Sequence, residues 1–198
     1  MVDLIDVIIK GDIEQLKLSL LQNDPSIINN RAIRYAALHG YLEAVKILLN
    51  DPRVDPSADN NDSIIQASKN GHIEIVKLLL TDPRVDPSDD DNYSIIWASN
   101  YGHTEVVKLL LADSRVDPSV SNNWAIRRAS TYGYTEVVKL LLVDPRVNPS
   151  AKNNKAIAEM PLARPSIISM ILKALVSVST HTMVSTVSCQ PGRKIISM

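Results

Sequence analysis

The sequence predicts an all-α solenoid made of stacked helix-turn-helix units, with short loops projecting at one edge. Gly40, Gly71, Gly102 and Gly133 are evenly spaced along the chain. The stretch "GHTEVVKLLL" also returns at the same interval as "GYTEVVKLLL". Self-similarity at this spacing is typical of arrays in which each unit buries its apolar face only against its neighbours. The 198 residues include no phenylalanine, which suits a core of Leu, Ile, Val and Ala layers between thin helices.

Composition and charge narrow the range of functions. The net charge of −1 gives no electrostatic reason to expect nucleic acid or an anionic membrane as a partner. No apolar run approaches the ~20 residues needed to span a bilayer. The first residues, "MVDLIDVIIKGD", have acids among the apolar residues and no basic start, so they are a poor secretory signal. The single cysteine, Cys189, excludes an intrachain disulfide and favours a reducing compartment. We therefore expect a cytoplasmic protein, and we expect it to be a monomer.

Residues 1–30 are expected to form an N-terminal capping repeat. The segment "LIDVIIKGDIEQLKLSLLQND" distributes charge over both of its predicted helices and lacks the "DPRVDPS" loop of later units. An end unit has one face without a neighbour, so a more polar outer face is expected there.

Four full units are expected at 31–61, 62–92, 93–123 and 124–154. Each begins with a thin helix, as in "SIIWAS", where Ile95, Ala98 and Ser99 share one face. The glycine that comes next permits the tight turn to a second helix, because a positive φ costs glycine little. In that helix, "EVVKLLL", the valines and leucines face inward while Glu105 and Lys108 face outward.

The loop "DPRVDPS" ends the second helix of each unit, because its two prolines cannot continue a helix and bias their predecessors to extended geometry. Its central valine, Val85 in the second full unit, is expected to point inward. The arginines of these loops are expected to bind acids or carbonyl groups of their own or the neighbouring unit rather than a ligand. They are Arg53, Arg84, Arg115 and Arg146.

The segments "NGHIEIVKLLL", "YGHTEVVKLLL" and "YGYTEVVKLLL" resemble the second half of the ankyrin repeat, which reads roughly T-P-L-H-x-A-A-x-x-G-H-x-E-V-V-K-L-L-L. The first half departs from that pattern, and "DPRVDPS" replaces the usual G-A-D-V-N finger. This variant finger is similar to those of arrays in large DNA viruses and protists, and either a β-hairpin or a tighter loop fits it. The resemblance covers residues 3–154 and implies an ankyrin-like scaffold that binds a protein and catalyses no reaction.

Residues 155–176 are interpreted as a degenerate C-terminal capping repeat. Pro161 interrupts its thin helix, and "PSIISMILKAL" then resumes the pattern with Ile168, Ile171 and Leu172, each one repeat length after an apolar residue of the preceding unit. The same segment weakly resembles the first helix of an F-box, which implies the alternative of an adaptor that recruits ubiquitin-ligase machinery. Residues 177–198 are expected to be a disordered tail, with an extra strand or a partner-binding segment as the alternative.

No constellation for catalysis, cofactor binding or metal binding is evident. His72 and His103 occupy a place that Tyr134 fills in another unit, so the position is expected to be structural. The run "SDDDN" lacks the central glycine and closing glutamate of a calcium loop. Cys189 has no partner for nucleophilic catalysis in view. We therefore expect no enzymatic activity, no cofactor and no metal.

A stripe of variable residues suggests where a partner binds. Three places in the thin helix, spaced i, i+4 and i+8, differ among units that are otherwise alike, and this spacing gives one stripe opposite the inward face. Six of the eight aromatic residues lie in it, and Tyr, Trp and Arg dominate interface hot spots. In ankyrin arrays this stripe lines the concave groove beside the finger tips. The resemblance thus implies protein-binding residues Tyr35, Gln66, Tyr93, Trp97, Tyr101, Trp124, Arg128 and Tyr132, with Asp89, Asp90 and Asp91 at a finger tip.

Overall fold

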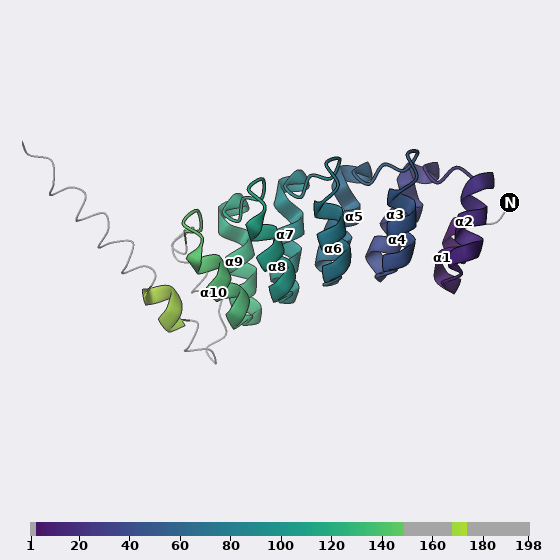
Figure 1. Ribbon diagram of the computed structural model, residues 1–198. Helices are drawn as coiled ribbons and strands as arrows, with labels where there is room; N and C mark the ends of the chain where they lie inside the picture. The colour runs from purple at the N-terminus through teal and green to yellow at the C-terminus, as the bar shows by residue number, and fades with distance from the viewer. Residues whose placement is uncertain (1–2, 149–167, 174–198) are drawn as a thin grey trace, which may run out of the picture.

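The computed structural model describes residues 3–148 and 168–173 of the chain. Five helix pairs follow one another within 3–148 (Figure 1). They are α1 (Leu4–Lys10) with α2 (Ile13–Gln22), α3 (Ile27–His39) with α4 (Leu42–Leu49), α5 (Ala58–Lys69) with α6 (Ile73–Leu80), α7 (Asp89–Tyr101) with α8 (Thr104–Ala112), and α9 (Val120–Tyr132) with α10 (Thr135–Val143). A further helix spans 168–173.

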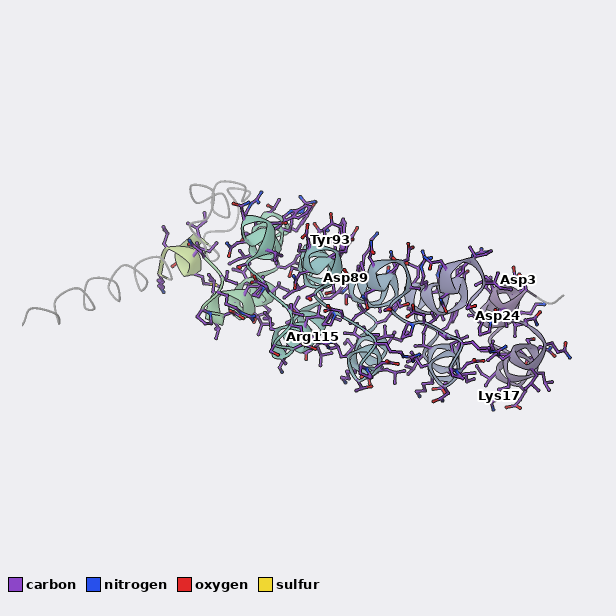
Figure 2. The ribbon with its side chains drawn as sticks, turned by 90° about the horizontal axis from the view of Figure 1, so that it is seen from above. Asp3, Lys17, Asp24, Asp89, Tyr93 and Arg115 are labelled. Atoms are coloured by element: carbon purple, nitrogen blue, oxygen red, sulfur yellow. The ribbon has the colours of Figure 1, made fainter. Side chains whose placement is uncertain are left out.

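The pairs form two parallel rows of helices. In one row α1, α3, α5, α7 and α9 contact each other in sequence, and in the other α2, α4, α6, α8 and α10 do so. The view along the helices in Figure 2 shows both rows. Each unit therefore touches only the units before and after it, as expected for a solenoid. No strand occurs in the residues that the structure describes, so the predicted all-α class is confirmed.

The core lies between the two rows and repeats from unit to unit. In α7 and α8 the side chains of Ile95, Ala98, Val106, Val107 and Leu110 are fully buried. These are the residues that the helical period placed inward. The valine of each finger loop also enters the core, and Val85 and Val116 are fully buried. The resulting apolar cluster is continuous from α1 to α10.

The finger loops are tight turns rather than β-hairpins. The second to fourth residues assigned to α3, α5, α7 and α9 are left-handed, and regular right-handed helix starts only after them. In α7, Asp90, Asp91 and Asn92 have φ of 49°, 55° and 58°. The amide of Asn92 donates to the carbonyl oxygen of Ser88 at 3.0 Å. Asn and Asp tolerate this conformation better than other non-glycine residues, which suits the "DNN" and "DDDN" sequences found here.

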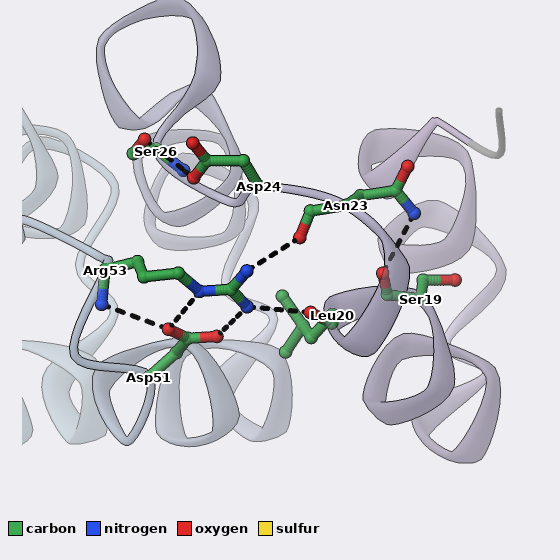
Figure 3. Close-up of polar contacts among 7 residues, drawn as sticks. All are labelled: Ser19, Leu20, Asn23, Asp24, Ser26, Asp51 and Arg53. Carbon is green, nitrogen blue, oxygen red and sulfur yellow. Dashed lines mark hydrogen bonds and ion pairs between the residues drawn. The ribbon is translucent and has the colours of Figure 1, made fainter.

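The loop arginines join each unit to the one before it. Figure 3 shows Arg53, which binds both carboxylate oxygens of Asp51, at 2.9 and 2.6 Å, and donates to the carbonyl oxygens of Asn23 and Leu20. Arg84, Arg115 and Arg146 repeat the pattern, each donating to the valine carbonyl of the previous finger loop. The expected contacts are therefore present. The acid partner is the aspartate two residues before each arginine.

These ion pairs shift the pKa of both partners. The pKa of Asp51, Asp82, Asp113 and Asp144 lies below the usual range, chiefly because the paired arginine donates hydrogen bonds to each carboxylate. The same hydrogen bonds raise the pKa of the arginines. Each aspartate is mostly buried while its arginine is about 40% exposed, so water weakens the interaction from one side.

A second set of inter-unit hydrogen bonds uses a buried asparagine at the end of each left-handed turn. The Oδ1 atom of Asn61 accepts from the amide of Asp86 at 2.8 Å, and that of Asn92 accepts from the amide of Asp117 at 2.7 Å. Asn30 and Asn123 make the equivalent bond. All four asparagines are buried. The side chain therefore satisfies a partly buried backbone amide of the next unit, which has no helical partner.

The two ends of the described array differ from expectation in their exposed side chains. In α2 of the N-terminal unit, Leu18 and Leu21 are 55% and 82% exposed, so this face is less polar than the sequence suggested. At the other end Ile171 is fully buried in the common core, whereas Leu172 is 49% exposed. The repeat register predicted that Leu172 would be buried, because it lies one repeat length after the buried Leu141. Helix 168–173 therefore turns a different face to the core than α10 does. Most of the residues predicted to form the C-terminal cap and tail, 155–198, lie outside the described part of the chain.

Candidate functional site

The candidate site is carried by α7 and α9, which lie side by side in one row. It consists of Tyr93, Trp97, Tyr101, Trp124, Arg128 and Tyr132, hereafter the α7–α9 surface. Figure 2 shows Tyr93 on the α7 row, with Asp89 at the start of the same helix. Ile and Ala fill the inward face of each helix. The six side chains of the α7–α9 surface lie on the opposite face. The three on each helix are spaced i, i+4 and i+8, so they form one stripe.

The surface is partly exposed, as its spacing predicted. Tyr101 and Tyr132 are 45% and 46% exposed, and the other four side chains are half-buried. Large aromatic side chains at this level of exposure offer apolar contact area without filling the core. This part of the array therefore presents aromatic rings from two neighbouring units together.

The rings contact one another in a continuous row. Tyr93 meets both tryptophans edge-on, with ring centroids 6.3 Å from Trp97 and 6.3 Å from Trp124. Trp97 stacks on Tyr101 at 5.9 Å. These distances and angles are those of favourable aromatic pairs. The contacts fix the positions of the rings relative to one another, and they also stabilise the two helices against each other.

Two cations of the chain lie on this surface. Lys69 Nζ stands 5.2 Å from the Trp97 ring centroid, and the Arg128 guanidinium is 5.9 Å from Trp124 and 5.4 Å from Tyr132. Arg128 is held there by its Nε, which donates to Oδ1 of the buried Asn100 at 2.8 Å. The geometry is that of cation–π contact. Sequence reasoning missed Lys69 and Asn100, since both contacts depend on how neighbouring helices are placed.

The three acidic finger-tip residues differ in availability. Asp89 accepts from Nδ2 of Asn61 at 2.9 Å and from the amide of Asp90, so it serves the unit junction. Asp90 and Asp91 are exposed, and neither forms an ion pair within the described residues. Their carboxylates therefore stay open to solvent in the turn that precedes Tyr93.

Tyr35 and Gln66 contact residues outside the α7–α9 surface. Tyr35 contacts the rings of His39 and Tyr41, and Gln66 donates to Asp62 at 2.8 Å. Asp62 also pairs with Arg34 at 2.9 Å. Six of the eight predicted stripe residues thus form the α7–α9 surface. The other two, Tyr35 and Gln66, have separate contacts, which are aromatic for Tyr35 and polar for Gln66.

The histidines at the start of the second helices have structural contacts. Nε2 of His103 lies 2.9 Å from the carbonyl oxygen of Lys69 and therefore acts as donor, and His72 does the same to Leu38. Each ring lies over the glycine of the preceding unit: a Cβ on Gly71 would be 2.6 Å from the ring of His103. No group of three His, Cys, Asp or Glu side chains that could hold a metal ion occurs in the described residues.

None of the helices in the described part of the chain is long and apolar enough to cross a membrane. A search of curated proteins gave no match. A family model described as "Ankyrin repeats (3 copies)" matches residues 4–91 and again residues 64–153. The two matches together span most of the chain and coincide with the stacked helix pairs. The chain therefore belongs to the ankyrin repeat family.

Proposed function

We propose that the chain is a non-catalytic scaffold that binds a protein partner through the α7–α9 surface together with Asp90 and Asp91. Ankyrin repeats generally mediate protein–protein interaction. The observation that supports this site is the ring row itself, in which four aromatic rings from two units stay partly exposed although the core beneath is complete. Contiguous exposed apolar area of this kind usually marks a binding surface.

The polar neighbours support a partner segment with apolar and basic groups. The aromatic rings offer large contact area at low entropic cost, and the exposed carboxylates of Asp90 and Asp91 belong to the turn that leads into Tyr93. Complementary charge at the rim of an interface raises the association rate and orients the partner. The proposed surface thus combines a hydrophobic centre with an acidic edge.

The alternative of an adaptor built on an F-box-like segment has less support. Ile171, which would belong to the apolar face of that segment, is fully buried in the core of the array. This favours a packing role for helix 168–173. Removal of residues 160–198 separates the two functions, because only an adaptor loses a ubiquitin-ligase partner through that deletion.

The experiment is a selection of peptides from a random library on the full chain, followed by affinity measurements on variants. The double variant Trp97→Ala/Trp124→Ala should weaken binding by at least about tenfold, as loss of hot-spot residues does. The matched control is Lys108→Ala/Lys139→Ala, which alters exposed side chains of α8 and α10. Peptides that bind the double variant as well as the wild type would refute the proposed site. A thermal melt of each variant shows whether the fold is intact.

A further inference from the structure

We propose that the α7–α9 surface, with Asp90 and Asp91, is covered by the chain's own segment 189–198, "CQPGRKIISM". This inference rests on the proposed binding surface and names an occupant for it. The segment would then compete with any external partner. Its charge, its side-chain chemistry and its reach all fit this surface.

The charge of the chain is divided unevenly between the array and the residues after it. The whole chain has 21 Lys and Arg and 22 Asp and Glu. Residues 149–198 contain six basic residues and one acidic residue, so residues 1–148 retain fifteen basic and twenty-one acidic ones. The two parts therefore carry net charges of about −6 and +5. The proposed segment itself carries two of these positive charges, Arg193 and Lys194, and opposite charges attract each other over the ~10 Å range set by physiological salt.

Part of the open negative charge of the array lies at the start of α7, the helix that carries Tyr93, Trp97 and Tyr101. Asp82 is bound by Arg84 and Asp62 by Arg34, so these carboxylates are already neutralised. Asp90 and Asp91, by contrast, are exposed and form no ion pair among the described residues. A basic segment drawn to the array thus meets unpaired acids at the edge of the α7–α9 surface.

The segment has the two chemical properties that this surface fits. Arg193 and Lys194 supply adjacent positive charges, and Ile195, Ile196 and Met198 come after them. The basic pair suits Asp90 and Asp91. The apolar side chains suit the exposed faces of Tyr101 and Tyr132. No acidic residue occurs after Glu159, so no side chain of the segment repels the carboxylates.

The segment is long enough to reach the surface. Helix 168–173 lies beside α10 in both views, with Ile171 in the common core (Figures 1 and 2). From there α7 is two to three helix spacings away, roughly 20–30 Å. Twenty residues separate Lys173 from Arg193, and a chain of that length extends to roughly 60 Å. A tether of this length also gives a local concentration in the mM range, so that a weak contact is well populated.

Tryptophan fluorescence can test this contact without further substitutions. The only two tryptophans, Trp97 and Trp124, lie on the proposed surface, and the only cysteine, Cys189, lies in the proposed occupant. A nitroxide attached to Cys189 quenches tryptophan emission only at short range. We expect labelled full-length protein to emit clearly less than unlabelled protein, and the emission to recover at about 1 M salt, where the screening length falls to about 3 Å.

Two variants identify the contact. Arg193→Glu/Lys194→Glu and Asp90→Asn/Asp91→Asn should each remove at least about half of the quenching, because the attraction is electrostatic. The matched control is Lys17→Glu/Lys46→Glu, which changes the net charge as much as the first variant does, on exposed side chains of α2 and α4. Quenching should be the same as in the wild type there. Dilution must not change it, since the contact is within one chain.

Three outcomes would overturn the proposal. In the first, labelling leaves tryptophan emission unchanged, and in the second, the charge-reversed segment quenches as strongly as the wild type. In the third, quenching disappears on dilution, which would instead show that the segment binds a second copy of the chain. The outcome is separate from that of the proposed function. Library peptides that bind at the tryptophans while quenching is absent would refute only this inference. Quenching in a chain for which no peptide is selected would refute only the external partner. If both hold, Arg193→Glu/Lys194→Glu should bind the selected peptides several-fold more tightly than wild type.

Discussion

Arg84 binds Asp82 within its own finger loop, at 2.9 and 2.6 Å, while its Nη1 donates to the carbonyl oxygen of Val54 one unit earlier, at 2.8 Å. One guanidinium thus braces a loop and joins two units. The planar group suits both tasks, because its donors are fixed in one fork. Arg115 and Arg146 have the same contacts with their own neighbours.

Acid should destabilise the array through these ion pairs. The pKa of Asp82 and Asp113 is lowered, first by the hydrogen bonds from Arg84 and Arg115. A lowered folded-state pKa contributes stability that is present above the unfolded value of about 3.9 and is lost as pH falls through the folded pKa. We expect the free energy of unfolding, measured in urea, to fall steeply below about pH 4. Asp82→Asn/Asp113→Asn should be less stable at pH 7 and should lose less on acidification. Arg84→Ala/Arg115→Ala should likewise reduce the loss of unfolding free energy on acidification. If this variant loses as much stability in acid as the wild type does, other groups cause the acid sensitivity.

Asn92→Ala should weaken the junction between two units. The substitution removes the Oδ1 acceptor of the Asp117 amide and leaves a partly buried donor without that partner, at a cost of about 1 kcal/mol. Asn122→Ala is the matched control, because Asn122 is also left-handed, with φ of 58°, but exposed. Both variants bear the strain of alanine at positive φ, so the difference in their urea midpoints isolates the hydrogen bond. Equal midpoints would mean that the bond contributes nothing to stability.

Gly71→Ala should be more damaging than Gly11→Ala. Both glycines have positive φ, of 73° and 66°, and share the cost of about 1–2 kcal/mol for a side chain in that conformation. Only at Gly71 would the new Cβ meet a ring, 2.6 Å from His103 Nδ1, whereas nothing lies within 4 Å at Gly11. We expect a lower melting temperature for Gly71→Ala, and partial recovery when His103→Ala is added. If His103→Ala lowers the melting temperature of the Gly71→Ala variant by as much as it lowers that of the wild type, the two residues are not coupled.

Leu110→Ala and Trp97→Ala should affect stability and binding in opposite order. Leu110 is fully buried, so its truncation leaves a cavity and costs about 2–5 kcal/mol. Trp97 is half-buried and contacts Tyr93, Tyr101 and Lys69, so we expect a smaller loss of stability and a larger loss of peptide affinity. Thermal melts and titrations on both variants check this. A melting temperature for Trp97→Ala as low as that of Leu110→Ala would place the ring in the core and remove it from the binding surface.

The helix pairs were predictable because the apolar period and the glycine spacing act locally. Val106, Val107 and Leu110 point inward in the structure, because their helical spacing places them on one apolar face. The left-handed turn of Asp90, Asp91 and Asn92 was not predicted, because three such residues in a row oppose intrinsic preference. The recurrence of asparagine at 30, 61, 92 and 123 was the available signal, and buried side-chain bonds between units explain it.

The candidate site was predictable in position but not in detail. The i, i+4, i+8 spacing correctly indicated that Tyr93, Trp97 and Tyr101 share a partly exposed stripe. The cation–π contacts of Lys69 and Arg128 depend on how far apart neighbouring helices stand, which no local pattern reveals. Whether this surface binds a partner stays a prediction for the titrations.

The two junction bonds also govern how an array of this kind changes in length. Each loop arginine reaches a main-chain oxygen of the unit before it, and each buried asparagine accepts from a main-chain amide of the unit after it. Because the partner group is backbone in both cases, duplication of one whole repeat brings every donor and acceptor with it and needs no compensating substitution. An insertion one residue shorter or longer than the repeat puts Arg and Asn out of step with their partners. Growth and loss by whole repeats is thus the route of gene rearrangement that this architecture tolerates.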